Sequence, residues 1–318
     1  NFYKNKKIIF RLDAGKKDGF GHLKRSVPLI NFLLRKSFSI VICTNNSTKN
    51  FLSKNLQKKV FLKKNNETEE IFFHRIKNKF RGYIIIIDKI YSYKKQTIID
   101  IKKENEVIFI QNFSSGARFS NKLIVPDDHN KSKKFEKNVF RGSKYLVIRN
   151  EIKKIKTIKE SNYLGVTFGG SDPYNLTIKI LEILQEINWK KKTIFFYGEG
   201  YLNKKDLIKE VSKVKNFDTC KFNFKKLLKS RLILSAFGVT SYEIAMFNVN
   251  NLVILLNKKI ILPQIHTFSS TNLLGYYKNM NIKKIENSLS KNWNINNRNK
   301  KFIIRSNGEN EIFNIIKN

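Results

Sequence analysis

Residues Asp13 to Arg25, which read DAGKKDGFGHLKR, are the stretch of this chain that decides its fold. The short apolar run Ile8 to Phe10 precedes them, and an amphipathic segment begins near Ser26. A strand that leads through a glycine-rich loop into a helix is a common anion-binding junction, because glycines let the backbone approach a ligand and the helix start presents free N–H groups. His22 directly follows the last glycine, so it either faces the charged part of a ligand or caps the following helix.

The first half of the chain alternates short apolar runs with longer amphipathic runs. This alternation predicts βαβ units around a mostly parallel sheet. The run Ile84 to Ile87 has no polar alternation, which is typical of a central strand covered on both faces. The expected strands are 7–12, 38–44, 83–88, 106–111 and 122–125, and the expected helices are 23–36, 48–56, 67–79 and 95–104.

A second series of the same kind follows the charged, glycine-poor stretch 150–161, which we interpret as a linker. Its expected strands are 164–167, 192–197, 232–235 and 252–256, and its expected helices are 175–187, 204–213, 241–247 and 309–317. We therefore expect an α/β protein with two Rossmann-like, doubly wound domains, at 1–150 and 151–318, and a ligand between them at the carboxyl ends of the strands.

The chain is strongly basic: 63 Lys and Arg against 25 Asp and Glu give a net charge of +38 over 318 residues. Such a charge is typical of proteins that bind nucleic acid or an anionic membrane. The basic residues are spread along the whole chain, with no run of six or more, which favours a coding bias and solvated surface lysines. We therefore expect no nucleic-acid partner and only weak association with anionic membrane surfaces. A basic surface still suits a nucleotide-diphosphate substrate.

The cysteines and acidic clusters do not indicate a metal site. Cys43 and Cys220 are far apart and lack metal-ligand spacing, as expected of free thiols in a reducing compartment. Asp127-Asp128-His129 has no second group of ligands near it in the sequence, so no metal is expected. No apolar run approaches the ~18 residues of a membrane span, and we expect a cytoplasmic protein.

Two further junctions of strand, turn and helix lie in the second half. Val166 to Pro173 read VTFGGSDP, where Gly170 and Ser171 either form a nest for a phosphate or ribose or make a tight turn. Leu234 to Glu243 read LSAFGVTSYE, with small residues that suit a diphosphate. The last carboxylate either accepts hydrogen bonds from ribose hydroxyls or favours the positive end of its own helix. The substrate-binding residues expected here are Phe237, Gly238, Val239, Thr240 and Glu243.

Taken in order, these motifs resemble those of the nucleotide-sugar hydrolases of pseudaminic acid biosynthesis, which act on a UDP-linked diacetamido sugar. GFGHLKR at 19–25 resembles the family's Gly-x-Gly-His-x-x-Arg loop, and GGSD at 169–172 resembles its Gly-Gly-Ser-Asp turn. SAFGVTSYE at 235–243 resembles its Ser-Ala-x-Gly-x-Thr-x-x-Glu element. GSKYLVIR at 142–149 and Asn307-Gly308 are similar to a segment near the domain junction and to the closing turn.

The resemblance implies a GT-B fold, in which two Rossmann-like domains with mostly parallel sheets face each other across a cleft, as in related glycosyltransferases. It implies inverting hydrolysis of the sugar–UDP bond without a cofactor or metal, and His22 as the catalytic base that activates water. An imidazole can take a proton from water at neutral pH, and backbone N–H groups can stabilise a leaving diphosphate. The first domain would bind the sugar and the second UDP, and we expect the chain to be fused to other sugar-nucleotide enzymes or to work beside them. The first loop would contribute the substrate-binding residues Asp13, Gly19, Gly21 and Arg25.

Some positions depart from the family's pattern. Its central strand usually ends Asp-x-Tyr, whereas this chain has DKIY at 88–91. An Asp pair that often follows the next strand is replaced by QN at 111–112, and a Gln-His-Glu group near 264–272 is blurred. The sugar's identity therefore stays open. The residues expected to shape the sugar or base pocket are Asp88, Tyr91, His266 and Asn272.

Two other functions stay open. A glycosyltransferase of the same fold would use a similar loop but pass the sugar to an acceptor other than water. A basic binding protein for nucleic acid or membrane would show an affinity that falls steeply with salt, and would release no UDP.

Overall fold

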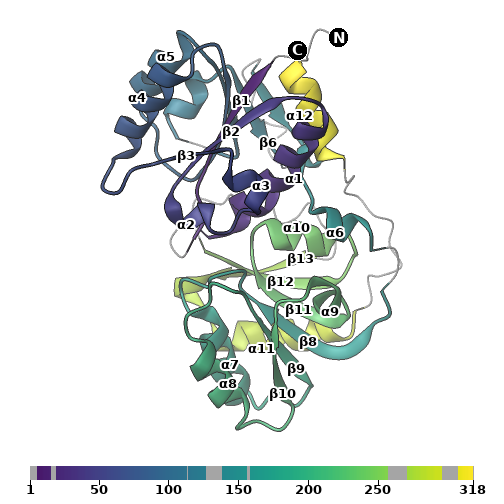
Figure 1. The fold of residues 1–318 in the computed structure, drawn as a ribbon. Helices are drawn as coiled ribbons and strands as arrows, with labels where there is room; N and C mark the ends of the chain where they lie inside the picture. Colours follow the sequence, from purple (N-terminus) through teal and green to yellow (C-terminus); the bar gives the residue numbers. More distant parts are fainter. Residues whose placement is uncertain are drawn as a thin grey trace. The chain divides into compact units, whose positions relative to one another are not determined.

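The structure, a computed structural model, describes residues 6–15, 19–112, 114–126, 138–155, 158–256, 271–295 and 307–317 (Figure 1). By its internal contacts the chain divides into two compact units. The first unit comprises Asn1–Asp18, His22–Arg149 and Arg305–Asn318, and the second comprises Gly19–Gly21 and Asn150–Ile304.

A parallel sheet forms the centre of the first unit. In the described part of the chain it has seven strands, in the order β3-β2-β1-β4-β5-β6-β7, and each neighbouring pair is parallel. The central strand β4 is buried at all five positions, as its unbroken isoleucine run predicts. The strands are β1 (Lys7–Leu12), β2 (Ser39–Thr44), β3 (Val60–Leu62), β4 (Ile84–Asp88), β5 (Glu106–Ile110), β6 (Lys122–Val125) and β7 (Val139–Arg141).

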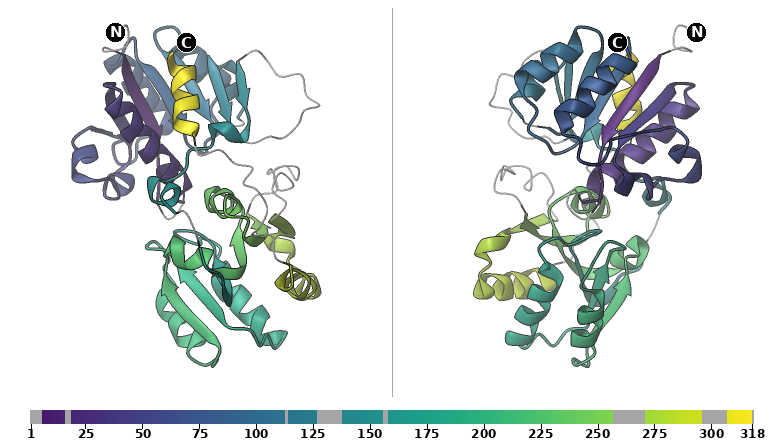
Figure 2. Two further views of the ribbon diagram at one scale, coloured as in Figure 1. Left: turned by 90° about the vertical axis from the view of Figure 1, so that its right-hand side faces the viewer. Right: turned by 60° about the vertical axis from the view of Figure 1, so that its left-hand side comes forward.

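Helices α4 and α5 pack on one face of this sheet (Figure 2). On that face, Phe72, Phe73 and Ile98 join Ile85 and Ile87 in one core. The helices of the first unit are α1 (Gly21–Arg35), α2 (Asn46–Lys49), α3 (Lys54–Gln57), α4 (Glu69–Lys79), α5 (Lys95–Lys102) and α12 (Gly308–Lys317). Two short 3-10 turns, η1 (Gly116–Phe119) and η2 (Ser143–Tyr145), complete it among the described residues.

The last helix, α12, belongs to the first unit, which differs from the expected domain of 151–318. Its first residue, Gly308, lies so close to η2 that an added Cβ would be 2.2 Å from the Leu146 carbonyl oxygen. The ring of Phe313 meets that of Phe32 edge to face, with centroids 6.1 Å apart. The amphipathic helix buries its apolar face against the first unit, and this burial is the physical reason for its place.

The second unit is built around a smaller parallel sheet. Among the described residues it has six strands, in the order β10-β9-β8-β11-β12-β13, all in parallel pairs. Helices α7, α8 and α11 pack on one face, with Leu181, Leu207 and Leu289 in a common core. The strands are β8 (Ser161–Thr167), β9 (Thr193–Tyr197), β10 (Phe217–Lys221), β11 (Ser230–Ala236), β12 (Asn250–Leu255) and β13 (Thr271–Tyr276). The helices are α6 (Asn150–Lys153), α7 (Leu176–Glu186), α8 (Lys204–Val211), α9 (Phe224–Leu228), α10 (Val239–Ala245) and α11 (Ile282–Trp293), with η4 (Tyr277–Asn279).

Several elements differ from the expected ones. The single helix expected at 48–56 is two short helices, α2 and α3, because the Asn45 side chain caps the first and a new helix begins after Ser53. The linker expected at 150–161 contains the short helix α6 and ends where β8 begins. The strands β3, β7, β10 and β13 and the helices α9 and α11 were not expected. β3 and β7 have only three residues each, too few for a period to show.

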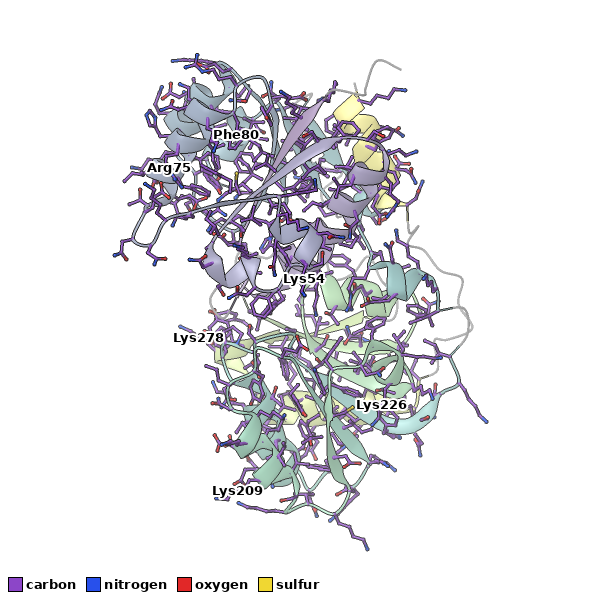
Figure 3. All side chains as sticks on the ribbon, viewed as in Figure 1. Lys54, Arg75, Phe80, Lys209, Lys226 and Lys278 are labelled. Atoms are coloured by element: carbon purple, nitrogen blue, oxygen red, sulfur yellow. The ribbon has the colours of Figure 1, made fainter. Side chains whose placement is uncertain are left out.

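Basic side chains extend from many different elements rather than from one. Lys54 on α3, Lys209 on α8 and Lys226 on α9 are all exposed and are labelled among the side chains in Figure 3. No helix of the described residues is long and apolar enough to cross a membrane.

Candidate active site

Two glycines shape the loop between β1 and α1. Gly15 has φ +148° and Gly19 has φ +72°, values that residues with a side chain rarely adopt. A Cβ on Gly15 would also lie 2.9 Å from Ser47 Oγ. Residues 16–18 lie outside the described residues. Gly21 begins α1, so His22 lies in the first turn of that helix.

Helix α2 holds the start of this loop. The backbone N–H of Ala14 donates to Thr48 Oγ1 at 2.7 Å, and the same hydroxyl lies 3.0 Å from the Ala14 carbonyl oxygen. The Asn45 backbone N–H donates to Asp13 Oδ1 at 3.1 Å, and the Asn45 side chain in turn accepts from the Thr48 N–H at 2.8 Å. The first residues of the loop are therefore fixed by the segment in which β2 ends and α2 begins. Sequence analysis missed this anchor, because it joins residues 34 positions apart.

Asp88, the last residue of β4, collects hydrogen bonds from α1. Its Oδ1 lies 2.6 Å from His22 Nδ1, and its Oδ2 accepts from Arg25 Nε and from Ser26 Oγ, both at 2.7 Å. Arg25 Nη2 also donates to Oδ1. Asp88 has no solvent exposure. Burial alone would raise its pKa, but the Arg25 guanidinium and His22 hold the pKa of this carboxyl well below its usual range. Asp88 is therefore a carboxylate that only accepts.

The carboxylate decides which nitrogen of His22 carries the proton. Because ionised Asp88 can only accept, we assign the hydrogen to Nδ1, which donates to Asp88 Oδ1. Arg25 Nη2 lies 3.0 Å from the same Nδ1, and both donors share the carboxylate. Neutral His22 then has its lone pair on Nε2, the nitrogen turned away from Asp88. The His22 side chain is 10% exposed. Because Nδ1 faces the carboxylate, Nε2 is the ring nitrogen that could take a proton from a ligand or water.

Arg25 is held by protein groups. In addition to Asp88, its Nη1 donates to Gln111 Oε1. Gln111 follows β5 with a left-handed backbone, φ 51°. The expected role of Arg25 as a substrate-binding residue stays a prediction, and its observed contacts orient Asp88 and His22.

A second buried set of charges, which we call the Arg11 network, comprises Arg11, Asp13, Glu69, Lys89 and Tyr93. The fully buried Arg11 guanidinium donates to Asp13 at 2.7 and 2.6 Å and to Glu69 at 2.8 and 2.6 Å. Lys89 Nζ donates to Asp13 Oδ2 and lies 3.5 Å from Glu69 Oε2. Tyr93 OH donates to Glu69 Oε1 at 3.0 Å. Two cations and two carboxylates therefore balance formally within the network.

The contacts of Asp13 are made to the protein. Its Oδ1 accepts from Arg11, Thr44 Oγ1 and the Asn45 N–H, and its Oδ2 accepts from Arg11 and Lys89. Burial alone would raise the pKa of Asp13, but Arg11 and Lys89 lower it to about 2. With five hydrogen bonds from protein groups, no lone-pair site of the carboxylate is left unused. The structure thus gives Asp13 an anchoring role, and its expected contact with substrate stays a prediction.

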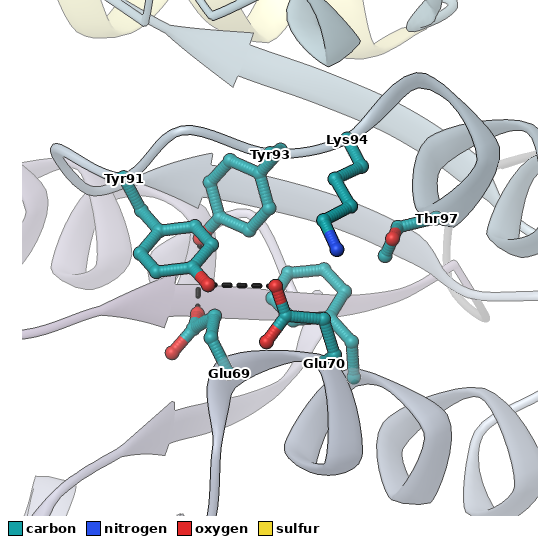
Figure 4. A pocket seen from close by; sticks show the side chains of 7 residues that line it. Glu69, Glu70, Tyr91, Tyr93, Lys94 and Thr97 are labelled. Atoms are coloured by element: carbon teal, nitrogen blue, oxygen red, sulfur yellow. Dashed lines mark hydrogen bonds between the residues drawn. The ribbon is translucent and has the colours of Figure 1, made fainter.

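Tyr91, expected as a substrate-binding residue, lines a small pocket beside the Arg11 network (Figure 4). Its OH donates to Glu70 Oε1 at 2.7 Å, and this bond raises the pKa of Tyr91 to about 12. The rings of Tyr91 and Tyr93 meet edge to face, with centroids 4.9 Å apart. Lys94 and Thr97 complete the polar lining of the pocket. Carboxylates of α4 and hydroxyls of the chain after β4 therefore line the pocket.

In the second unit, the turn after β8 is organised by Asp172. Its side chain accepts from the backbone N–H groups of Leu176 and Thr177, at 2.9 and 2.8 Å, and from Thr177 Oγ1 at 2.7 Å. Asp172 thereby caps the start of α7, and burial raises its pKa. Gly170 and Ser171 precede this cap, and Ser171 is 8% exposed. The expected tight turn is present, and whether its residues contact a ligand stays a prediction.

The turn after β11 closes on itself through Ser241. The Gly238 N–H donates to Ser241 Oγ at 3.0 Å, and the Ser241 N–H donates to the Gly238 carbonyl at 3.0 Å. Val239 and Thr240 are half-buried, whereas Phe237 is buried at 7% exposure and Glu243 at 0%. The ribose contact expected of Glu243 stays a prediction.

Polar groups that sequence analysis quoted in the motifs, but did not assign to the site, lie in the second sheet. Thr167 Oγ1, at the end of β8, is buried and has no hydrogen-bond partner among the described residues. Ser235 lies opposite Thr167 in the register and donates to Asn251 Oδ1 at 2.9 Å. The sequence signal that could have identified Thr167 and Ser235 is their position at or near the carboxyl ends of strands. Asn272, an expected site residue, donates to Asn292 Oδ1 at 2.9 Å, while His266 and the Asp127-Asp128-His129 triple lie outside the described residues.

Comparison with known sequences gives a distant relative. No protein-family model matches the chain. The chain is similar to MJ1062, an uncharacterized protein of Methanocaldococcus jannaschii, with 28% identity over 265 residues, which are 74% of this chain and 53% of the relative. The chain therefore spans about half the length of the curated relative that it matches.

Solved structures resemble the whole chain. A UDP-GlcNAc 2-epimerase from Methanocaldococcus jannaschii has 15% identity and a TM-score of 0.59, with 98% of this chain and 99% of that chain covered. MurG from Acinetobacter baumannii has 10% identity and a TM-score of 0.57, with 98% and 99% covered. MnaA from S. aureus in complex with UDP has 11% identity and a TM-score of 0.65, with 98% and 96% covered. At these identities the likeness shows the fold alone. Together with the two parallel sheets and their interleaved helices, it shows that the chain has the GT-B fold with two Rossmann-like domains.

Proposed function

We propose that this chain is an enzyme that hydrolyses the bond between UDP and an amino sugar, with inversion at the anomeric carbon, in the synthesis of pseudaminic or related nonulosonic acids. The observation that carries the proposal is the contact of His22 Nδ1 with the buried Asp88 carboxylate at 2.6 Å. A base oriented in this way is suited to take a proton from water. The motif resemblance adds the substrate class, and two of the GT-B structures are a UDP-GlcNAc 2-epimerase and a complex with UDP.

In the proposed reaction, a water oxygen attacks the anomeric carbon while the bond from that carbon to the UDP oxygen breaks. The bonding electrons leave with UDP, and His22 Nε2 takes the proton of the attacking water. Asp88 stabilises the imidazolium that forms, as a carboxylate fixed by Arg25 and Ser26 can do without gaining a proton itself. The products are UDP and the free sugar with inverted configuration. Every step uses protein groups and water.

The second unit would hold the nucleotide under this proposal. Gly238 and Thr240 would contact the diphosphate, Glu243 the ribose, and Gly170 with Ser171 the phosphate edge. The support for these roles is the resemblance of the two glycine-centred turns and the general tendency of open parallel sheets to bind ligands at the carboxyl ends of their strands.

The test combines product analysis with one variant. The purified chain is incubated with UDP-linked amino sugars in heavy-oxygen water, without an acceptor, and the products are followed by mass spectrometry and by NMR of the anomeric proton. We expect UDP and free sugar, with the label on the sugar and the inverted anomer formed first. His22→Ala should lower turnover by about 10²–10⁴-fold, the usual contribution of a general base. His74→Ala, which changes an exposed histidine of α4, is the matched control.

Other products would redirect the proposal. A second UDP-sugar that differs in configuration at a ring carbon would indicate an epimerase. Transfer that begins only when a glycan or lipid acceptor is added would indicate a glycosyltransferase, in which His22 would deprotonate an acceptor hydroxyl. No UDP release under any condition, together with nucleic-acid affinity that falls steeply with salt, would indicate a basic binding protein.

A further inference from the structure

Lys89 is the most accessible charged group of the Arg11 network. Its side chain is 11% exposed, whereas those of Arg11, Asp13 and Glu69 are 0%, 2% and 4% exposed. Lys89 directly follows Asp88, so it stands at the carboxyl end of β4, the edge at which parallel sheets bind ligands.

Both the ammonium and the backbone of Lys89 are held by hydrogen bonds or ion pairs. Its Nζ donates to Asp13 Oδ2 and lies 3.5 Å from Glu69 Oε2. Its carbonyl oxygen accepts from Asn112 Nδ2 at 2.8 Å, and the same amide donates to the Tyr91 carbonyl at 3.0 Å. An ammonium has three N–H donors. Asp13 accepts one of them, and the ion pair with Glu69 holds the ammonium in place. Among the described residues, the ammonium therefore keeps a donor for a further acceptor at the edge of the sheet.

The charge balance of the network indicates which kind of acceptor this N–H donor can bind. Arg11 and Lys89 are balanced by Asp13 and Glu69, so the network has no formal net charge with which to attract a phosphate. An uncharged oxygen, such as an amide carbonyl or a hydroxyl, satisfies the remaining N–H without adding an unbalanced charge to a mostly buried cluster.

We propose that Lys89 is a specificity-determining residue that donates a hydrogen bond to an uncharged oxygen of the sugar part of the substrate. The inference rests on the proposed function, because it assumes a UDP-linked sugar. Asp13 and Glu69 are positioning residues that hold the ammonium, and Asn112 fixes the backbone that carries it. A purely structural role for Lys89 would not distinguish UDP from a UDP-sugar.

Calorimetric titration tests this inference without relying on turnover. The full chain with His22→Ala is titrated with UDP and with UDP-GlcNAc, alone and in combination with Lys89→Met, Lys89→Arg or Lys103→Met. Lys103→Met removes one positive charge from a side chain at the end of α5 that is 64% exposed, and it is the matched control. Thermal unfolding of each variant checks that it folds. Lys89→Arg keeps the charge balance of the network, so it keeps the test valid if Lys89→Met does not fold.

We expect the ratio of the Kd for UDP to the Kd for UDP-GlcNAc to fall about tenfold or more in Lys89→Met, the usual effect of losing a hydrogen bond to a charged group. The Kd for UDP should not change. Lys89→Arg should lower the same ratio, since a planar guanidinium cannot place its N–H groups where an ammonium does. Lys103→Met should leave the ratio unchanged.

Three results would overturn the inference. If neither Kd changes with the Lys89 substitutions, Lys89 does not bind the sugar, although the proposed function survives. If the Kd for UDP rises as much as that for UDP-GlcNAc, Lys89 binds the diphosphate instead. If the His22→Ala parent binds neither ligand, the proposed function itself fails and the role of Lys89 fails with it.

Discussion

Asp88→Asn is the substitution that tests the candidate site most directly. The change keeps the shape of the side chain and removes its negative charge. In the native protein, Asp88 receives hydrogen bonds from His22 Nδ1, from Arg25 and from Ser26. An amide offers one acceptor oxygen and presents an NH₂ group to the remaining donors. Two of the present donors would therefore face a group that cannot accept.

Two effects follow, and they have different sizes. Leaving the buried Arg25 guanidinium without its carboxylate should cost roughly 3–5 kcal/mol of the free energy of unfolding if nothing rearranges. If the new NH₂ group turns toward His22, it donates to Nδ1, and the histidine proton moves to Nε2. The nitrogen assigned as the base would then be blocked, and turnover should fall about 10²–10⁴-fold, as for loss of a general base. The affinity for UDP should change little, because no UDP contact is assigned to Asp88.

The assay measures UDP release, the Kd for UDP, and unfolding in urea for the native chain, Asp88→Asn and Asp100→Asn. Asp100 is an acidic residue on α5 with a 39% exposed side chain, and it serves as the control. A turnover rate of Asp88→Asn within about tenfold of the native rate would refute the reasoning, since the orientation of His22 would then not matter. Equal losses of turnover and of UDP affinity would point instead to a general loss of structure.

Two predictions concern stability. The pKa of Asp13 falls from 3.8 to about 2 on folding. The contribution of Asp13 to the free energy of unfolding is therefore present above pH ~4 and is lost as the pH falls toward ~2, by roughly 2–3 kcal/mol at most. Urea unfolding at a series of acidic pH values should show this loss in the native chain and a smaller one in Asp13→Asn, and identical pH profiles would contradict the assignment. Removing the cap of α7 with Asp172→Ala should lower the free energy of unfolding by about 1 kcal/mol. The loss is smaller than for a fully favourable cap, because burial already raises the pKa of Asp172. Asp206→Ala, at an exposed position of α8, is the control, and an equal effect of the two substitutions would argue against the cap.

Much of the fold follows from the sequence because its signals are local. The unbroken run Ile84 to Ile87 became the buried central strand β4, and the glycine-rich stretch at 13–25 became the junction of β1 and α1. The place of α12 was not predicted, because nothing near 309–317 in the sequence shows that its apolar face covers the first unit. Such contacts are made between residues far apart in the chain, and periodicity contains no information about them.

The candidate site was predicted in part. His22 and Asp88 were both selected, but as a base and a pocket residue, and their contact joins positions 66 residues apart. Asp13 was assigned to the substrate because it begins the loop, whereas its oxygens face Arg11, Lys89 and a neighbouring strand end. The long-range pairing of a buried arginine with two carboxylates has no signature in a single sequence. In the sequence alone, Arg11 is only one polar residue in an expected strand.

The alternation of side chains along a strand explains how one strand end can serve two networks. Leu12 pairs with Asp88 in the register, and Arg11 precedes Leu12, so Arg11 and Asp88 point to opposite faces of the sheet. Arg11 packs over the ring of Phe72 on α4, while Asp88 contacts α1. Lys89, one residue further, follows the Arg11 side. The carboxyl end of β4 therefore orients the His22 imidazole on one face and the Lys89 ammonium on the other.

The charge balance of both networks limits what the first unit can bind. The charge of Asp88 is matched by Arg25, and the Arg11 network balances within itself. Neither offers an uncompensated positive charge, so a diphosphate would gain little Coulomb energy from them. Under the proposed function, the turns of the second unit would bind the diphosphate, while the two networks of the first unit would contribute directed hydrogen bonds to the sugar. This division predicts that substitutions at Lys89 alter the choice of sugar, whereas substitutions at Gly238 or Thr240 weaken binding of UDP and of every UDP-sugar alike.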